Sequence, residues 1–486
     1  MLLNVFKRVN INLALLFCFH GTLFTLYAGN NKSELKGLVE KASTIFIFEE
    51  ELNLLRHDFS PWKKTSYQLN GEFWQTNSQF NKFDTLTTAS GKQYRSEVTI
   101  GRNVFLRKTY GKSELTKVTQ REYENQLVNT ARYTPNYLEQ YFKSQKEIRY
   151  WDNEKYMVSK LEIGDYTVNI FKSRKTDIIE RITALSHDDL YGDVTTTYRY
   201  SSYVTKYTIT YPSKIRIEKI NGKVIDNVTI AGIYRKGEME PLISKPNDYQ
   251  FEIVELPLKK LIVSKYNEHI YLIDLVHTDD KVLVVEFDDF LLVAEAPISS
   301  ENGELIIAEI KKSISNKPIK YFIFGHHHPH YLGGIRAFIH QEATILCETS
   351  NLEYVKFIAE AKHTLKPDSL EVNPKPLVTE IIKDSLTIGN KYPMKIYWIG
   401  EKSKHTSDYL IYYFPSDKLL FQDDLCWIPN DGPLKKARER QAGLYLSIID
   451  LNIEVDTIIQ SWPVGEFGVK TIFPFKDLES SVQMKE

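Results

Sequence analysis

The stretch YFIFGHHHPHYLGG, residues 321–334, is the most informative part of the chain. An apolar strand runs into four histidines within five residues, and a glycine pair and a helix-like segment to His340 follow. Imidazole is the commonest metal-binding side chain, and alternate residues of an extended turn can direct two of them at one ion. Because α/β proteins place their chemistry at strand ends, the stretch predicts a metal site. The alternative is a polar loop with a chance run of histidines.

Length and composition indicate a globular protein of two or three domains. The chain has 486 residues, of which 42% are hydrophobic and 26% charged. Lys+Arg 62 against Asp+Glu 63 leaves a net charge of −1, so no overall field attracts nucleic acid or an anionic membrane. The expected partner is a small-molecule or lipid-like substrate and not nucleic acid. Peripheral membrane contact stays open, and the sequence does not indicate an oligomeric state.

Residues 1–28 have the pattern of a signal peptide. Lys7 and Arg8 supply the positive start, residues 11–27 are mostly apolar, and the small residues at 28–29 suit cleavage. This predicts an extracytoplasmic protein, periplasmic or secreted. A retained membrane anchor is the alternative, because polar and small residues at 20–21 interrupt the apolar run.

Removal of such a signal would leave two cysteines, Cys347 and Cys426. Two thiols are too few for a disulfide framework. Both have apolar neighbours in the sequence, so we expect buried core residues.

The first half of the chain predicts a helix followed by a large antiparallel sheet. A helical pattern covers about Ser33 to Arg56, and short segments of alternating polarity recur from about 66 to 230, with a helical interlude near 120–144. Residues 212–223 read as a strand ending in an Asn-Gly hairpin turn. In this pattern alone, the half resembles the half-barrel of periplasmic lipoprotein carriers. A binding, positioning or dimerisation module is the expected role.

The second half predicts mixed sheets covered by helices. Charge, Gly and Pro concentrate around 235–249, and more continuously apolar strands follow. Amphipathic helices fit 301–315, 352–361 and 434–451. The predicted fold class is α+β, divided into a signal peptide (1–28), an antiparallel β-rich domain (30–235), a linker (236–250) and a second domain (251–486).

From about 252 to 475 the chain resembles the metallo-β-lactamase superfamily. The signature of that family is His-x-His-x-Asp-His-x-Gly-Gly after a strand, and residues 326–334, HHHPHYLGG, match it at His326, His328 and both glycines. The resemblance implies an αββα fold, in which helices enclose two mixed sheets. His330 stands at the aspartate position of the motif, and Tyr331 at the position of its next histidine.

Two downstream segments match further ligand positions of the family. His405, followed by Thr-Ser-Asp, matches the third metal histidine. Residues 420–424, LFQDD, match a strand that ends in Leu-Phe-x-Gly-Asp, with Asp424 in the metal-bridging place and Asp423 replacing glycine. The terminal histidine of the family has no counterpart, because residues 459–465, IQSWPVG, contain none.

The pattern of matches predicts one well-formed zinc site. His326, His328 and His405 are what one tetrahedral zinc needs, with water in the fourth position. The altered or missing groups are those that hold the second metal of the family, so a second ion would rely on Asp424 and His330. Cys426 is a further candidate ligand, but the favoured interpretation of this residue is a buried core thiol. The metal-ligand prediction therefore comprises His326, His328, His405, Asp424 and His330.

The neighbours of these ligands leave the chemistry open. His327 is expected to point away from the ion, because consecutive residues of an extended turn face opposite ways. His330 fits three roles, as metal ligand, proton shuttle or polar loop residue. His330 and Asp424 are the predicted catalytic residues. Because His330 cannot act as an ionised carboxylate, altered substrate chemistry or reduced activity is expected.

The resemblance implies a metal-dependent hydrolase, and the predicted signal peptide implies that it is exported. Zinc held by three neutral histidines lowers the pKa of bound water to about 7, which supplies hydroxide for attack on an ester, amide or phosphoester bond. The alternative is a catalytically inactive protein of the same fold that binds a ligand or a partner. Fold alone does not decide between these functions or name the substrate.

Overall fold

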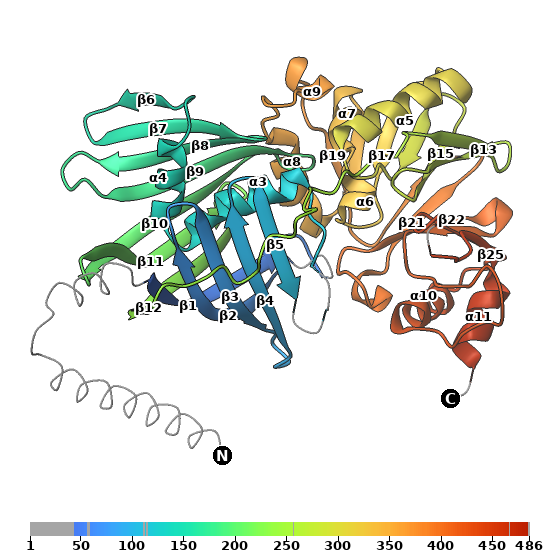
Figure 1. Ribbon diagram of the computed structural model, residues 1–486. Helices are drawn as coiled ribbons and strands as arrows, with labels where there is room; N and C mark the ends of the chain where they lie inside the picture. The colour runs from blue at the N-terminus through green and yellow to red at the C-terminus, as the bar shows by residue number, and fades with distance from the viewer. Residues whose placement is uncertain are drawn as a thin grey trace, which may run out of the picture.

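The computed structural model describes residues 43–55, 59–109, 112, 115–255, 257–465 and 467–484. Figure 1 shows a large curved sheet formed by the first half of the chain beside a layered domain formed by the second half. The α+β class is confirmed. The predicted signal peptide lies outside the described residues.

The N-terminal domain is a 12-stranded sheet in which all neighbouring strands are antiparallel. The order is β5-β4-β3-β2-β1-β12-β11-β10-β9-β8-β7-β6. Its strands are β1 (Ser43–Leu55), β2 (Lys64–Gln75), β3 (Gln79–Thr87), β4 (Gln93–Gly101), β5 (Val104–Thr109), β6 (Arg149–Asp152), β7 (Tyr156–Ile163), β8 (Tyr166–Ser173), β9 (Ile179–Asp188), β10 (Gly192–Lys206), β11 (Ile209–Lys219) and β12 (Val224–Lys236). The predicted Asn-Gly turn joins β11 to β12.

The helix predicted from Ser33 to Arg56 is wrong over its described part. Residues 43–55 form β1, which lies between β2 and β12 in the middle of the sheet. The side chains of Phe46, Phe48 and Glu50 are buried, whereas Ile47 and Glu49 between them are exposed. The segment therefore has the period of two that a strand requires, and the run of glutamates obscured it. Residues 33–42 lie outside the described part.

The helical interlude is confirmed as α3 (Gln120–Asn129), the short η1 (Thr130–Arg132) and α4 (Pro135–Lys143). These helices lie on one face of the sheet and share its apolar core (Figure 1). Tyr200 donates a hydrogen bond to the carbonyl of Ala131 at 2.7 Å. Arg132 pairs with the buried carboxylates of Glu50 and Asp226, which fixes the helical connection on the sheet.

Residues 237–260 connect the two domains without a regular helix or strand in their described part. The segment runs along the N-terminal domain, where the backbone N–H of Leu242 donates to Asn81 and that of Glu252 to the carbonyl of Val118. The hydroxyl of Tyr249 donates to the carbonyl of Phe105. The domain limits stated above stay a prediction.

Two mixed sheets form the C-terminal domain. In the seven-stranded sheet the order is β13-β14-β15-β16-β17-β18-β19, antiparallel up to β16 and parallel from there on. Its strands are β13 (Leu261–Lys265), β14 (Ile270–Leu275), β15 (Asp280–Glu286), β16 (Leu291–Ala294), β17 (Ile319–Ile323), β18 (Thr344–Glu348) and β19 (Thr379–Ile382). The six-stranded sheet contains β20 (Ser385–Ile388), β21 (Met394–Trp398), β22 (Leu410–Phe414), β23 (Leu419–Gln422), β24 (Thr457–Gln460) and β25 (Ile472–Pro474), in sequence order.

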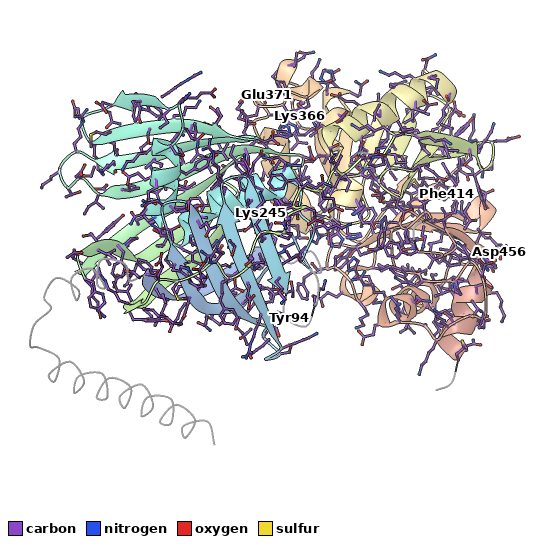
Figure 2. The ribbon with its side chains drawn as sticks, in the orientation of Figure 1. Tyr94, Lys245, Lys366, Glu371, Phe414 and Asp456 are labelled. Atoms are coloured by element: carbon purple, nitrogen blue, oxygen red, sulfur yellow. The ribbon has the colours of Figure 1, made fainter. Side chains whose placement is uncertain are left out.

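Helices cover the outer faces of both sheets. The helices α5 (Ser300–Ser313), α7 (Ile335–His340) and α8 (Leu352–Glu360) share a core with the seven-stranded sheet. The helices α10 (Glu439–Asp450) and α11 (Phe475–Gln483) share one with the six-stranded sheet. A third core lies between the sheets and includes Phe414, labelled in Figure 2. Strands buried on both faces need apolar residues at every position, which explains the continuous apolar runs.

Helix limits differ from those predicted at one place. The pattern predicted a helix over 434–451, but α10 begins at Glu439. The other two amphipathic helices lie within two residues of their predicted limits. Cys347 and Cys426 are buried in separate cores, as expected. Among the described residues, no helix combines the length and the apolar content that a bilayer crossing demands.

An aromatic contact joins the domains. Trp62 packs against Tyr191, in the turn between β9 and β10, and against Tyr354 and Phe357 of α8, with ring centroids 5.7, 5.2 and 4.9 Å apart. The hydroxyls of Tyr191 and Tyr354 are 2.9 Å apart. Nearby, Lys366 lies where the domains meet (Figure 2). The contact therefore couples the N-terminal sheet to the helix that covers the second domain.

Replacement of Trp62 by alanine is expected to cost about 2–3 kcal/mol, less than the 3–5 kcal/mol of a fully buried tryptophan, because Trp62 is only partly buried. Urea unfolding followed by tryptophan fluorescence and circular dichroism should then separate into two transitions. Trp151→Ala is the matched control, because Trp151 is 42% exposed on the edge strand β6. A single unshifted transition in W62A would contradict the coupling.

A buried histidine near the same junction predicts acid sensitivity. His363 is 2% exposed and packs edge-on against the ring of His187 at 5.4 Å. Burial, with the charge of Arg336, lowers the pKa of His363 to about 4. In the unfolded chain His363 takes up its proton at about pH 6.5, whereas in the folded chain it does so only at about pH 4. The contribution of neutral His363 to the free energy of unfolding is therefore present above about pH 6.5 and is lost as the pH falls toward about 4. The free energy of unfolding in urea, measured at about pH 7 and about pH 5, should fall less in His363→Gln than in the unmodified chain.

Candidate metal centre

The histidine loop begins where β17 ends, at the junction of the two sheets. The backbone N–H of Leu410 in β22 donates to the carbonyl of Gly325 at 2.7 Å, which ties the loop to the second sheet. His328 precedes the one-turn helix α6 (Pro329–Leu332). A Cβ on Gly333 would lie 2.4 Å from the backbone of Ile298, so only glycine lets this turn pack so closely. Local packing thus holds the loop from both sides.

Four predicted ligands come together at this junction. One ligand atom from each of His326, His328, His405 and Asp424 lies within 4.8 Å of the others. His405 comes from the loop that precedes β22, and Asp424 follows β23. Three elements far apart in the sequence therefore converge, and three imidazoles with a carboxylate are a donor set suited to a metal ion.

His326 is oriented for metal binding. Its side chain is fully buried, and its Nδ1 lies 2.7 Å from a carboxyl oxygen of Asp423. Its other nitrogen, Nε2, is buried without a hydrogen-bond partner. Burial, with the neighbouring histidines, holds the pKa of His326 well below its ordinary value. A neutral imidazole with one nitrogen engaged and the other unpaired fits a metal ligand.

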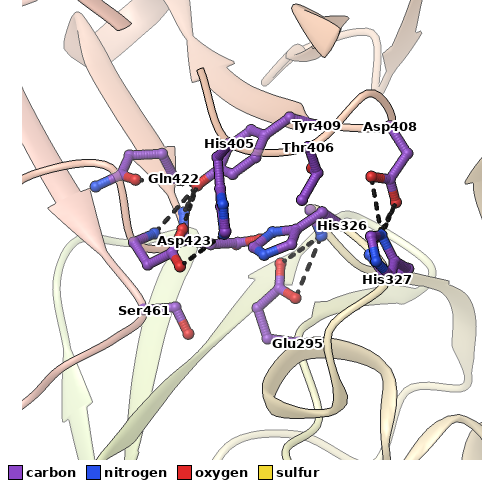
Figure 3. A network of polar contacts seen from close by, with 12 residues as sticks. Glu295, His326, His327, His405, Thr406, Asp408, Tyr409, Gln422, Asp423 and Ser461 are labelled. Carbon is purple, nitrogen blue, oxygen red and sulfur yellow. Dashed lines mark hydrogen bonds and ion pairs between the residues drawn. The ribbon is translucent and has the colours of Figure 1, made fainter. Parts of the chain in front are cut away.

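Behind His326 lies a pair of buried carboxyl groups, Asp423 and Glu295 (Figure 3). Glu295 accepts hydrogen bonds from the backbone N–H of Gly325 and from the hydroxyl of Tyr412 at 2.9 Å. Burial raises the pKa of Glu295 to about 8, and burial and the charge of Glu295 raise that of Asp423 well above its ordinary value. Two such carboxyls in contact hold a proton between them at neutral pH.

Asp424 lies on the ligand side of the same strand end. Its carboxylate is 3.1 Å from Nε2 of His405 and 3.6 Å from the guanidinium of Arg440. Burial raises the pKa of Asp424, but the pairing with His405 outweighs it and keeps the pKa below its ordinary value. Tyr409 stacks on His326 with ring centroids 4.8 Å apart, and its hydroxyl accepts the backbone N–H groups of Asp423 and Asp424. Asp424 is thus an ionised ligand candidate on a fixed backbone.

His327 turns away from the four ligands, as expected. Its backbone N–H and its Nδ1 both lie within hydrogen-bond distance of Asp408, at 2.8 and 3.1 Å (Figure 3). Asp408 also accepts from the side chain of Asn351 at 2.8 Å. The buried pair of His327 and Asp408 therefore fixes the loop, and His327 is not one of the four candidate ligands.

His330 does not join the ligand group. Its Nδ1 lies 3.0 Å from the buried carboxylate of Asp280, and its side chain is 39% exposed. Burial lowers the pKa of His330, but the hydrogen bond and charge of Asp280 outweigh burial and raise it. The structure therefore places His330 beside the site, in contact with Asp280.

An aromatic cluster adjoins His330. The ring of Trp462 lies 5.8 Å from that of His330 and packs against Trp427 and Phe467 at 5.8 and 5.2 Å. An aromatic surface therefore lies next to His330.

Sequence reasoning did not identify Asp280, Asp408 and Asp423 as partners of histidines, or Glu295 as the acceptor of the backbone N–H of Gly325. The sequence did mark Asp423 as unusual, because an acid stands beside Asp424 where the motif quoted above has glycine. It also marked Glu295, because this acid directly follows a continuous apolar strand. No sequence spacing indicates which acid reaches which histidine, since these partners lie 30 to 97 residues from the loop residues that they contact.

Comparison with solved structures finds metallo-β-lactamases that match about half of the chain. A metallo-β-lactamase from Pontibacter korlensis matches 46% of this chain over 100% of its own, with 17% identity and a TM-score of 0.34. The metallo-β-lactamase DIM-1 matches 47% of this chain over 96% of its own, with 18% identity and a TM-score of 0.34. FIM-1 from Pseudomonas aeruginosa, in its mono-zinc form, matches the same shares at 16% identity and a TM-score of 0.34. About half of the chain thus matches metallo-β-lactamase structures.

No family model and no curated protein matches the sequence.

Proposed function

We propose that the C-terminal domain is a single-metal hydrolase that uses zinc. The observation that carries the proposal is the convergence of three histidines and one aspartate, from three separate segments, within 4.8 Å. Zinc suits this set of nitrogen and oxygen donors, and three protein histidines leave a position for water. When bound, zinc would act as a Lewis acid and activate a water molecule for hydrolysis.

The side chains of the site have distinct roles in this proposal. His326, His328 and His405 hold the ion, and Asp424 beside them is the carboxylate that orients the attacking water and accepts its proton. Asp280 keeps the proton on Nδ1 of His330, so that the imidazole presents its other nitrogen toward its surroundings. His330 is then a polar group beside the substrate and not a ligand.

The substrate is proposed to be an ester, an amide or a phosphoester that carries an apolar group. The aromatic cluster of Trp427, Trp462 and Phe467 supports the apolar part, because such rings bury apolar surface and stay rigid. Phe467 is 49% exposed, so this surface is accessible. Export of the protein, carried by residues 1–28, is proposed alongside and makes the substrate extracytoplasmic.

Metal analysis and activity assays test the hydrolase. The purified chain, stripped with a chelator and reloaded, should bind one equivalent of zinc. The loaded protein should then hydrolyse at least one nitrophenyl ester, anilide or phosphodiester, and the stripped protein should not. Failure to bind zinc, iron or manganese would exclude the proposal.

The second candidate is a binding protein of the same fold without catalysis. The position of His330 outside the ligand group favours it, because the family motif has an aspartate there. One equivalent of zinc without turnover of any of the three substrate classes would support this alternative.

A further inference from the structure

We infer that Asp423 is a positioning residue that fixes the ring of His326 for metal binding, an inference that rests on the proposed function. The family motif has glycine at this place, so the chain adds a carboxyl group directly behind a ligand. Asp423 and His326 are both fully buried, and Nδ1 lies 2.7 Å from the carboxyl oxygen (Figure 3). With Nδ1 as donor, the lone pair of Nε2 faces the ligand group.

The surroundings of Asp423 are built for this contact. A Cβ on Gly325 would lie 2.1 Å from the carboxyl oxygen of Asp423, so the absence of a side chain at 325 makes room for the acid. The backbone N–H of Asp423 donates to the hydroxyl of Tyr409, which fixes the strand end. Glu295 and Tyr412 complete the network on the far side. The contact of Asp423 with His326 therefore depends on the absence of a side chain at Gly325.

The role requires a hydrogen-bond acceptor toward Nδ1 and does not require a charge. The substitution Asp423→Asn would keep an oxygen for Nδ1 and would offer an N–H to Glu295, which makes asparagine a conservative replacement. The substitution Asp423→Ala would remove the acceptor, leave the Nδ1 proton buried without a partner and let the ring rotate. Loss of such a partner of a ligand typically lowers metal affinity by about 10–100-fold.

The chain supplies a matched control. Asp408 makes the same kind of buried contact with His327, which is not a ligand. Asp408→Ala removes a carboxylate of equal burial from a contact with the same loop, and Asp408→Asn matches the conservative change. Asp408 also accepts from the backbone N–H of His327 and from Asn351, but of the two acids only Asp423 contacts His326.

The experiment measures zinc dissociation constants of the full chain by competition with a chromophoric chelator. We expect D423A to weaken zinc binding by about 10–100-fold and D423N to retain it, whereas D408A and D408N retain it. Visible bands of the cobalt(II)-loaded protein should shift in D423A alone, because they report ligand geometry. Gly325→Ala, which displaces Asp423 without removing a polar atom, should weaken binding as well.

Three results would overturn the inference: wild-type affinity in D423A, equal losses in D423A and D408A, or a loss in D423N as large as that in D423A. If D423A does not fold, D423N and Gly325→Ala still decide the matter. Failure of the unmodified chain to bind zinc would instead overturn the proposed function, so the two failures are distinguishable.

Discussion

Replacement of His405 by alanine is expected to lower zinc affinity by more than about 100-fold, because loss of a ligand exceeds the 10–100-fold cost of losing a ligand's partner. His405 is the proposed ligand from the loop between η3 (Gly400–Ser403) and β22. Without His405, only His326 and His328 remain of the three histidines proposed to hold the ion. Equilibrium dialysis with zinc and the hydrolysis assays should both report the loss.

His327→Ala is the control for this variant. His327 lies between His326 and His328 but contacts Asp408, so its loss should lower stability and leave zinc affinity unchanged. Unchanged zinc binding in H405A would remove His405 from the site. Equal losses in both variants would show a general disturbance of the structure and not the loss of a ligand.

Replacement of Arg336 by methionine is expected to lower the free energy of unfolding by about 3–5 kcal/mol, the usual cost of breaking a buried ion pair. Arg336 is 2% exposed on α7 and pairs with Asp368 at 2.6 Å. Its Nη1 also donates to the carbonyls of Ile358, Ala359 and Ala361 at the end of α8. The variant would remove the cation that pairs with the buried carboxylate of Asp368 and a donor to three carbonyls, whereas Asp368 keeps its hydrogen bonds from Ser300 and Glu371. Urea unfolding monitored by circular dichroism measures the loss.

A surface pair provides the comparison. Lys402 and Asp450 are 2.8 Å apart but 61% and 55% exposed, so Lys402→Ala should cost less than about 1 kcal/mol. Changing both partners, in R336M combined with Asp368→Leu, should recover part of the loss because no buried charge is left alone. A loss in R336M as small as that in K402A would contradict the assigned role of this pair.

The second half of the chain was the more predictable. Strands that are buried on both faces appear in the sequence as continuous apolar runs, as at β16 (Leu291–Ala294) and β17 (Ile319–Ile323). Residue identity and short spacing also singled out His326 and His328, because both lie on one turn. The first half was less predictable at its start, where FIFEEELNLL alternates like a strand but contains three consecutive glutamates.

The sequence by itself determined the types of the candidate ligands and the strand that precedes His326 and His328. These are properties of local chemistry and of short periodicities. Only the tertiary structure decided that His330 contacts Asp280, that His327 contacts Asp408 and that His326 contacts Asp423. Each of these pairs forms because distant strand ends meet where the two sheets pack together. A buried carboxyl must find a donor there, and the three-dimensional arrangement alone decides which one it reaches.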